Sequence, residues 1–441
     1  MVKDLTEGSP RRVLWQFTIP MFVSVVFQQL YNIADSIIAG QFAGEDALAA
    51  VGASYPVTMI FMAIAVGSNI GCSVVISNLF GAKKYKEMKT AVYTTLATAF
   101  VLSVVLTVSG LLGTGGLMAV IRTPENIFAD GALYLGIYIG GFTFLFLYNV
   151  ATGIFSALGD SRTPLYFLIA SSLGNILLDY IFVAVCGWGV AGVAWATFAA
   201  QGIACVLALF TMKRRLDGVK TEGGSEFFSW EMLRRIGQIA VPSILQQSFV
   251  SVGNIFIQGL VNSYGSSVIA GYSAAVKLNT FAITSFTTLG NGISNFTAQN
   301  LGAGKGERVR EGFRAGIQMA VIVVAVFFAA FFLNRERMVR LFMGEESTMA
   351  LSTGMVFLEI VSPFYIIISV KLLADGVLRG AGAMRQFMAS TFTDLVLRVV
   401  LAFLLSGVSG SIGIWLSWPV GWGVAAVMSV VFYRKLKLEL A

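Results

Sequence analysis

The chain has 441 residues, of which 56% are hydrophobic and only 12% are charged, and its mean hydropathy is +0.80. This composition excludes an ordinary soluble domain and is typical of a helical protein that crosses a membrane many times. The net charge of +7 does not indicate nucleic-acid binding, because basic residues concentrate beside apolar segments, as at Lys213-Arg214-Arg215. With no histidine in the chain, any proton chemistry depends on carboxylates.

Hydropathy predicts twelve membrane-spanning helices, and therefore an all-α polytopic membrane protein. The expected cytoplasmic segments carry 23 of the 30 Lys and Arg residues and the outer loops carry 4. This asymmetry predicts a protein of the plasma (inner) membrane with both termini in the cytoplasm. We expect no cleavable signal peptide, because the first apolar run already has full spanning length. The expected helices cover residues 14–39, 47–78, 91–113, 129–155, 165–186, 189–212, 236–262, 268–299, 315–334, 351–378, 387–406 and 411–433.

The first expected helix carries a polar face inside the uncharged run of residues 13–34. Gln28, Tyr31, Asn32 and Asp35 lie at positions i, i+3, i+4 and i+7, so they share one side of the helix. A carboxylate on a spanning helix is costly unless it meets a partner, an ion or water, so Asp35 is a functional candidate. The alternative is that Asp35 lies at the helix end and is hydrated there.

The fifth expected helix, residues 165–186, carries a second polar face made of Ser172, Asn175 and Asp179. Neither Asp35 nor Asp179 has a Lys or Arg at pairing distance on its own helix. Two carboxylates with amide and hydroxyl oxygens form a hard oxygen-ligand set suited to Na⁺, and the same pair could share or exchange a proton. The alternative is that the two faces never meet and only pack.

Three further acidic residues lie inside apolar runs. Asp375 follows Lys371 by four residues and Asp394 precedes Arg398 by four residues. Each pair can therefore neutralise itself on its own helix, and we interpret both as structural ion pairs. Glu359 lies about two turns into its helix from the outer face, where hydration at the rim would account for it.

The chain contains an internal repeat of two halves. Residues 19–33 match residues 241–255 at an offset of 222, and two glycine-containing motifs match at offsets of 221 and 223. Each half holds six expected helices, an even number, so both halves enter from the cytoplasmic side and the repeat is parallel. The predicted organisation is an N-lobe, a cytoplasmic linker and a C-lobe, which cover residues 1–212, 213–235 and 236–441.

The polar faces are absent from the second half of the repeat. At these offsets Asp35 corresponds to Ile257 and Asp179 corresponds to Ala402. We therefore expect the N-lobe to handle the ion. A single site that is not repeated also argues against a channel.

At these residues the sequence resembles the MATE (multidrug and toxic compound extrusion) family, and its DinF-like branch more than its NorM-like branch. The resemblance covers nearly the whole chain: twelve helices, a parallel six-plus-six repeat, and Pro20 followed by Asp35 fifteen residues later. Gln246-Gln247 stands in the seventh helix, where the NorM-like pattern has an acid, which argues against a Na⁺ site in the C-lobe. The resemblance implies a cation or proton site made of Asp35, Asn175, Asp179 and Thr197. It also implies a substrate cavity lined by Gln28, Tyr31 and Asn149. We add Ser172 to this cavity because it lies on the polar face of the fifth helix.

Two classes of function remain open. The first is an exporter that exchanges Na⁺ or H⁺ for a small amphipathic, cationic compound by alternating access, as a monomer in membrane lipid without a further cofactor. The second is a flippase for lipid-linked saccharides or lipids, whose cavity would need more bases for a pyrophosphate than the three inside the apolar runs. The sequence does not support an enzyme, because the chain has no nucleophile motif and no phosphate loop. The cysteines form no CxxC pair, and we interpret them as packing residues: Cys72, Cys186 and Cys205.

Overall fold

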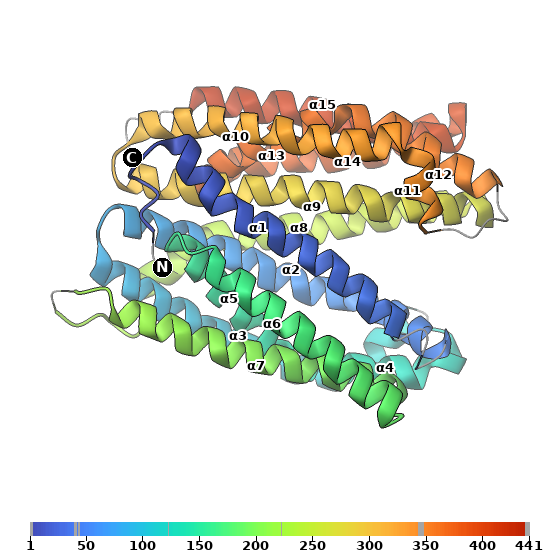
Figure 1. The fold of residues 1–441 in the computed structure, drawn as a ribbon, viewed down its shortest axis with the longest axis horizontal. Helices are drawn as coiled ribbons and strands as arrows, with labels where there is room; N and C mark the ends of the chain where they lie inside the picture. Colours follow the sequence, from blue (N-terminus) through green and yellow to red (C-terminus); the bar gives the residue numbers. More distant parts are fainter. Residues whose placement is uncertain are drawn as a thin grey trace. The chain divides into compact units, whose positions relative to one another are not determined.

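The computed structural model consists of helices joined by short connections, with no strand among the residues that it describes (Figure 1). These are residues 3–38, 42, 45–121, 123–221, 223–342 and 348–436, and the side chains of residues 35, 36 and 45–48 lie outside the description as well. The predicted all-α fold is confirmed. Every one of the twelve expected spans overlaps a helix, or helices that follow one another directly.

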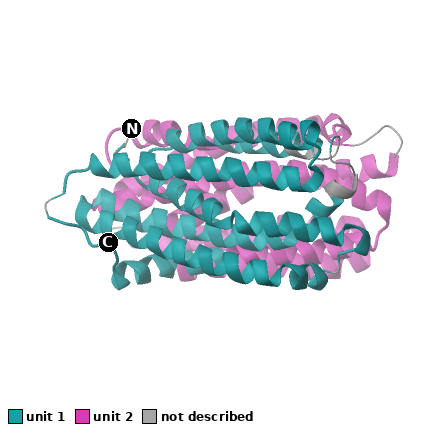
Figure 2. Ribbon diagram, turned by 90° about the horizontal axis from the view of Figure 1, so that it is seen from below, with its two compact units in different colours: residues 1–4, 23–245 teal, residues 5–22, 246–441 magenta. Residues whose placement is uncertain are grey.

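The chain forms two compact units, shown in different colours in Figure 2. Unit 1 comprises residues 1–4 and 23–245, and unit 2 comprises residues 5–22 and 246–441. Helix α1 (Pro10–Ile38) therefore begins in unit 2 and ends in unit 1, whereas helix α8 (Trp230–Asn262) begins in unit 1 and ends in unit 2. Hydropathy places both helices but carries no information about the partners of their first turns.

The remaining helices of unit 1 follow one another from α2 to α7. They are α2 (Glu45–Gly81), α3 (Tyr85–Val120), α4 (Glu125–Gly140), α5 (Phe142–Ala157), α6 (Arg162–Asp179), which continues as a π-helical segment (Tyr180–Val185), and α7 (Gly189–Asp217).

Unit 2 holds the helices from α9 onward. They are α9 (Ser266–Gly302), α10 (Gly306–Phe328) with a π-helical extension (Ala329–Leu333), α11 (Arg335–Arg340), α12 (Thr348–Val361), a 3-10 turn (Ser362–Phe364), α13 (Tyr365–Gly380), α14 (Met384–Ser409) and α15 (Ser411–Lys435).

Ten spans in the described part of the chain are long and apolar enough to cross a membrane, and α4 with α5 forms an eleventh that bends by 47°. Helix α9 is also long enough, at 37 residues, but it is more polar than the others. Asn279, Asn295 and Asn300 are all buried on this helix. Because these amides face protein and not lipid, a lower hydropathy does not prevent α9 from serving as the remaining expected span.

Glycines allow a close approach between the first halves of α1 and α8 and their neighbours. In unit 1, a Cβ built on Gly71 of α2 would lie 2.5 Å from the Cβ of Ala240 on α8. In unit 2, a Cβ built on Gly292 of α9 would lie 2.8 Å from Oγ1 of Thr18 on α1. The two contacts are related by the repeat offsets, so each unit contains the same small-residue helix contact.

The residues before α1 are also held inside unit 2. The backbone N–H of Leu5 donates to Oε1 of Gln299 on α9 at 2.9 Å. The guanidinium of Arg308 on α10 donates to the carbonyl of Gly8 at 2.8 Å. These bonds satisfy backbone groups that would otherwise be unpaired next to a helix start.

Candidate functional site

A polar cavity lies among three helices of unit 1 that are far apart in the sequence. It measures about 270 Å³ including its open mouth. Helices α1, α6 and α7 line it with Gln28, Tyr31, Leu168, Ser171, Ser172, Asn175, Thr197, Ala200 and Gln201. The structure thus brings together five of the residues singled out from the sequence: Gln28, Tyr31, Ser172, Asn175 and Thr197.

Asn175 is the most deeply buried polar residue among those that line this cavity. Its side chain is 2% exposed, and neither Oδ1 nor Nδ2 makes a hydrogen bond with a residue that the structure describes. Oε1 of Gln201, which lines the same cavity, is buried and lacks such a bond to the described residues as well. Buried amide groups are normally paired, so two of them at one cavity indicate a place built for a polar ligand.

Asp179 lies one helical turn beyond Asn175 at the end of α6 and is 1% exposed. A π-helical segment begins at the next residue, so Asp179 lies where the helix changes its pitch. Asp35 has its backbone in α1, one turn beyond Tyr31, but its side chain lies outside the described residues. The predicted meeting of the two carboxylates therefore stays a prediction.

The polar face of α1 divides in the structure. Gln28 and Tyr31 line the cavity, whereas Asn32 is exposed. The amide of Gln28 donates to Oδ1 of Asn32 at 3.2 Å, and the amide of Asn32 donates to Gln29 at 3.3 Å. Asn32 therefore lies at the edge of this polar face. Fewer residues of α1 line the cavity than the predicted polar face contains.

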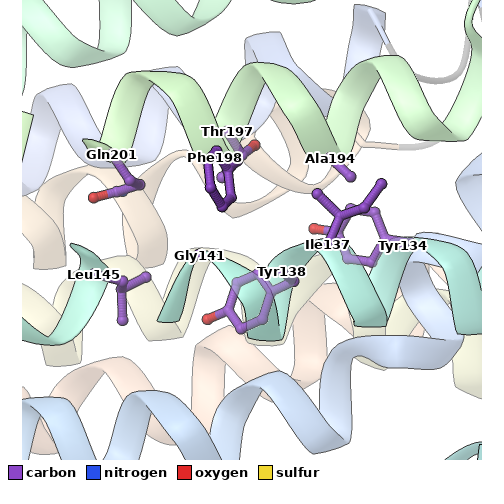
Figure 3. A pocket seen from close by; sticks show the side chains of 9 residues that line it. All are labelled: Tyr134, Ile137, Tyr138, Gly141, Leu145, Ala194, Thr197, Phe198 and Gln201. Atoms are coloured by element: carbon purple, nitrogen blue, oxygen red, sulfur yellow. The ribbon is translucent and has the colours of Figure 1, made fainter. Parts of the chain in front are cut away.

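Thr197 lies on α7 between this cavity and a second one (Figure 3). The second cavity measures about 300 Å³ including its mouth, and Figure 3 shows the side chains of α7 facing those of α4 and α5 across it. The bend between α4 and α5 falls at Gly141, where a Cβ would lie 2.9 Å from the ring of Phe198. The residues that line the second cavity are Tyr134, Ile137, Tyr138, Gly141, Leu145, Ala194, Thr197, Phe198 and Gln201.

Asn149 lies outside the described lining of both cavities. Its Nδ2 donates to the carbonyl of Leu145 at 2.9 Å within α5, and its own carbonyl accepts a bond of 2.7 Å from Asn69 of α2. Its predicted role in a substrate cavity is therefore untested. Here it contributes to the contact between α2 and α5.

Gln201 was not among the residues predicted for the site. It lies four residues after Thr197, so the two residues share one face of α7 and line both cavities. This i, i+4 polar pair inside an apolar span is the same signal that selected the faces of α1 and α6. The sequence signal was therefore present, although it contains no charge.

The predicted ion pairs of unit 2 have different outcomes. Nζ of Lys371 lies 2.8 Å from Oδ2 of Asp375, and both side chains are almost fully buried. Asp394 and Arg398, both described and 6% exposed, form no ion pair within 4.0 Å, so the predicted pair is wrong for this structure. The guanidinium of Arg398 lies instead 4.7 Å from the ring centre of Trp418 on α15, because a buried cation also finds favourable contact on an indole face.

Glu359 is exposed, in agreement with a position at the rim. Its side chain is 53% exposed, and its carboxylate lies 3.7 Å from the guanidinium of Arg335. This acid therefore needs no functional explanation.

The fold and the cavity together define an integral membrane protein of the transporter class. It has ten or more apolar spans in its described part and a polar cavity, next to a buried acid, among the helices of one unit. The MatE family profile matches residues 20–181 and 242–404, one block in each half of the repeat. The chain belongs to the MatE family, and like other members of that family it is a transporter and not an enzyme.

Relatives are similar over almost the whole chain. The probable multidrug resistance protein YoeA of Bacillus subtilis is 27% identical, with 98% of this chain and 96% of that protein covered. The probable multidrug resistance protein YpnP of the same organism is 28% identical with the same coverage. The predicted membership of the MATE family is therefore confirmed.

Solved structures show the same fold. A MOP superfamily transporter from Pyrococcus furiosus has a TM-score of 0.91 at 23% identity, with 98% of this chain and 96% of that chain covered. An outward-facing multidrug resistance MATE family transporter has a TM-score of 0.90 at 24% identity with the same coverage. The twelve-helix architecture in two six-helix halves fits these structures.

Proposed function

We propose that this chain is an antiporter, coupled to Na⁺ or H⁺, that exports small amphipathic organic cations by alternating access. It would act as a monomer in the plasma membrane with both termini in the cytoplasm. The observation that carries the proposal is the cavity of unit 1, where Asn175 and Thr197 converge with Gln28 and Tyr31 one turn from the buried Asp179. Further support comes from the names of the Bacillus subtilis relatives, both probable multidrug resistance proteins.

The residues present fit a small hard cation. Oδ1 of Asn175 makes no hydrogen bond to a described residue, and the hydroxyl of Thr197 lines the same cavity. With the carboxylates of Asp179 and Asp35 they would supply Na⁺ with oxygen ligands only. A proton would use the carboxylates alone, because two neighbouring acids in a low dielectric resist ionising together.

Coupling would arise from competition within unit 1. A cation or proton bound near Asp179 removes negative charge from the cavity where an organic cation would bind. The loss of attraction weakens substrate binding, and by reciprocity the substrate weakens ion binding. The two ligands then favour different states of the transporter, as antiport requires.

The test is uptake of a fluorescent organic cation into vesicles that hold the purified protein, under separately imposed Na⁺ and H⁺ gradients. Asp179→Asn should reduce gradient-driven uptake to the level of protein-free vesicles. The matched control is Glu359→Gln, the same type of change at the exposed rim acid, which should retain uptake. Equal loss in both variants, or full activity of Asp179→Asn, would contradict the assignment.

A flippase for lipid-linked saccharides has less support. Recognition of a pyrophosphate calls for basic side chains. The nine described residues that line the polar cavity include no Lys or Arg.

A further inference from the structure

A buried carboxylate in unit 2 is held by three neighbours. Asp375 on α13 is 2% exposed, and its Oδ1 accepts hydrogen bonds from Ser429 of α15 at 2.6 Å and from Ser390 of α14 at 3.2 Å. Both serines are fully buried. The ammonium of Lys371 lies 2.8 Å from the other oxygen, Oδ2.

The two carboxylate oxygens of Asp375 make different contacts. The serine hydroxyls bind Oδ1, and such bonds favour the ionised form of a carboxylate. Oδ2 makes no hydrogen bond to a described residue but lies against the ammonium of Lys371. The buried guanidinium of Arg379, four residues further along α13, also interacts electrostatically with this carboxylate. Hydroxyls from two helices thus fix the orientation of the carboxylate, the ammonium of Lys371 contacts it directly, and the charge of Arg379 acts on it as well.

The repeat shows that this cluster is not a packing device common to both halves. At the offset of 223, Asp375 corresponds to Thr152 and Lys371 corresponds to Tyr148. In unit 1 the hydroxyl of Thr152 accepts a bond of 3.0 Å from Asn69, so neutral groups connect the helices there. Unit 2 therefore carries a charge pair at a position where the fold does not require one.

We propose that Asp375, held by Ser390 and Ser429, is a monovalent-cation site of unit 2 that Lys371 fills with its own ammonium. The ligand class is a primary ammonium or another small monovalent cation, and the lysine supplies it as part of the chain. The carboxylate of unit 2 then carries a permanent cation and does not exchange with ions in solution. This inference goes beyond the proposed function, and its test needs no transport.

The experiment removes the tethered cation and supplies a free one. Lys371→Ala deletes three carbons and the nitrogen, and n-propylammonium has the same heavy atoms. Thermal unfolding of the detergent-solubilised full chain is measured against n-propylammonium concentration at constant ionic strength. The unfolding temperature of Lys371→Ala should rise and saturate, whereas the wild type and Lys371→Ala/Asp375→Asn should show no saturable rise. Propan-1-ol, the neutral isostere, should not reproduce the effect.

Four results would overturn the proposal. One is an equal response of the single and double variants, which would place the amine elsewhere. Another is an equal effect of propan-1-ol, which would reduce the effect to cavity filling. The third is a folded Lys371→Ala protein that takes up a proton and ignores the amine. If Lys371→Ala gives no monodisperse protein by itself, n-propylammonium should restore the yield and propan-1-ol should not. Failure of both compounds to restore the yield is the fourth result that would overturn the proposal.

Discussion

Replacing Asn175 by leucine should stabilise the protein and remove the ion binding that we propose for this residue. The side chain is 2% exposed, and both amide atoms lack a hydrogen bond to the described residues. A buried polar group without a partner costs about 1–3 kcal/mol, and leucine has a similar size without polar atoms. We therefore expect Asn175→Leu to raise the free energy of unfolding in Na⁺-free buffer by at least about 1 kcal/mol.

A second buried asparagine provides the matched control. Asn279 on α9 is 1% exposed, and its Oδ1 accepts a hydrogen bond of 3.1 Å from the hydroxyl of Tyr365, which is fully buried. Asn279→Leu leaves that hydroxyl without its acceptor and should cost about 1–3 kcal/mol. The same substitution at the same burial thus has opposite signs at the two positions.

The assay is thermal unfolding in detergent over a Na⁺ titration and a pH series, followed by vesicle uptake for each variant. Asn279→Leu should keep the ion dependence of the wild type, whereas Asn175→Leu should lose it together with ion-driven uptake. The reasoning is refuted if Asn175→Leu is as destabilising as Asn279→Leu in Na⁺-free buffer. The amide of Asn175 would then be satisfied within the protein, and it would not be available to an ion.

Two further predictions concern coupling and packing. Binding of Na⁺ or protons near Asp179 should weaken binding of an organic cation by roughly 5–150-fold, which corresponds to a coupling free energy of about 1–3 kcal/mol. The measurement is substrate titration at several Na⁺ concentrations and several pH values. A substrate affinity that depends on neither ion would contradict competition within unit 1. Gly71→Ala should destabilise unit 1 by about 1–3 kcal/mol because its Cβ would lie 2.5 Å from that of Ala240. Gly52→Ala on the same helix, where a Cβ would meet no described atom within 4 Å, should be neutral or slightly stabilising in thermal unfolding.

The periodicity of α6 is sufficient by itself to select cavity residues. Asn175 and Ser172 lie on one polar face of α6, and both line the cavity. Such a face must point toward other polar groups of the protein, because lipid offers no hydrogen bonds. Periodicity orients a face within its own helix and does not identify the helix opposite. For that reason the sequence did not reveal that Asn149 bonds within α5 and toward α2.

Other features depend on contacts that no local pattern records. The i, i+4 spacing of Asp394 and Arg398 allows an ion pair, but α15 presents the indole of Trp418 to the same guanidinium. The 47° bend between α4 and α5 falls at Gly141, where the ring of Phe198 from α7 leaves no room for a Cβ. In each case the competing partner comes from a different helix, so only the assembled fold decides between the alternatives.

The exchange of the first halves of α1 and α8 between the two units has a consequence for the origin of this fold. A chain that ended at residue 229 would contain Gly71 without Ala240, and Thr18 without Gly292. Two copies of such a half would rebuild both contacts if they exchanged these segments, as protomers do in a domain-swapped dimer. The present chain is equivalent to that dimer with its two protomers joined by the linker. In this chain each half therefore supplies a segment that completes a helix contact of the other half.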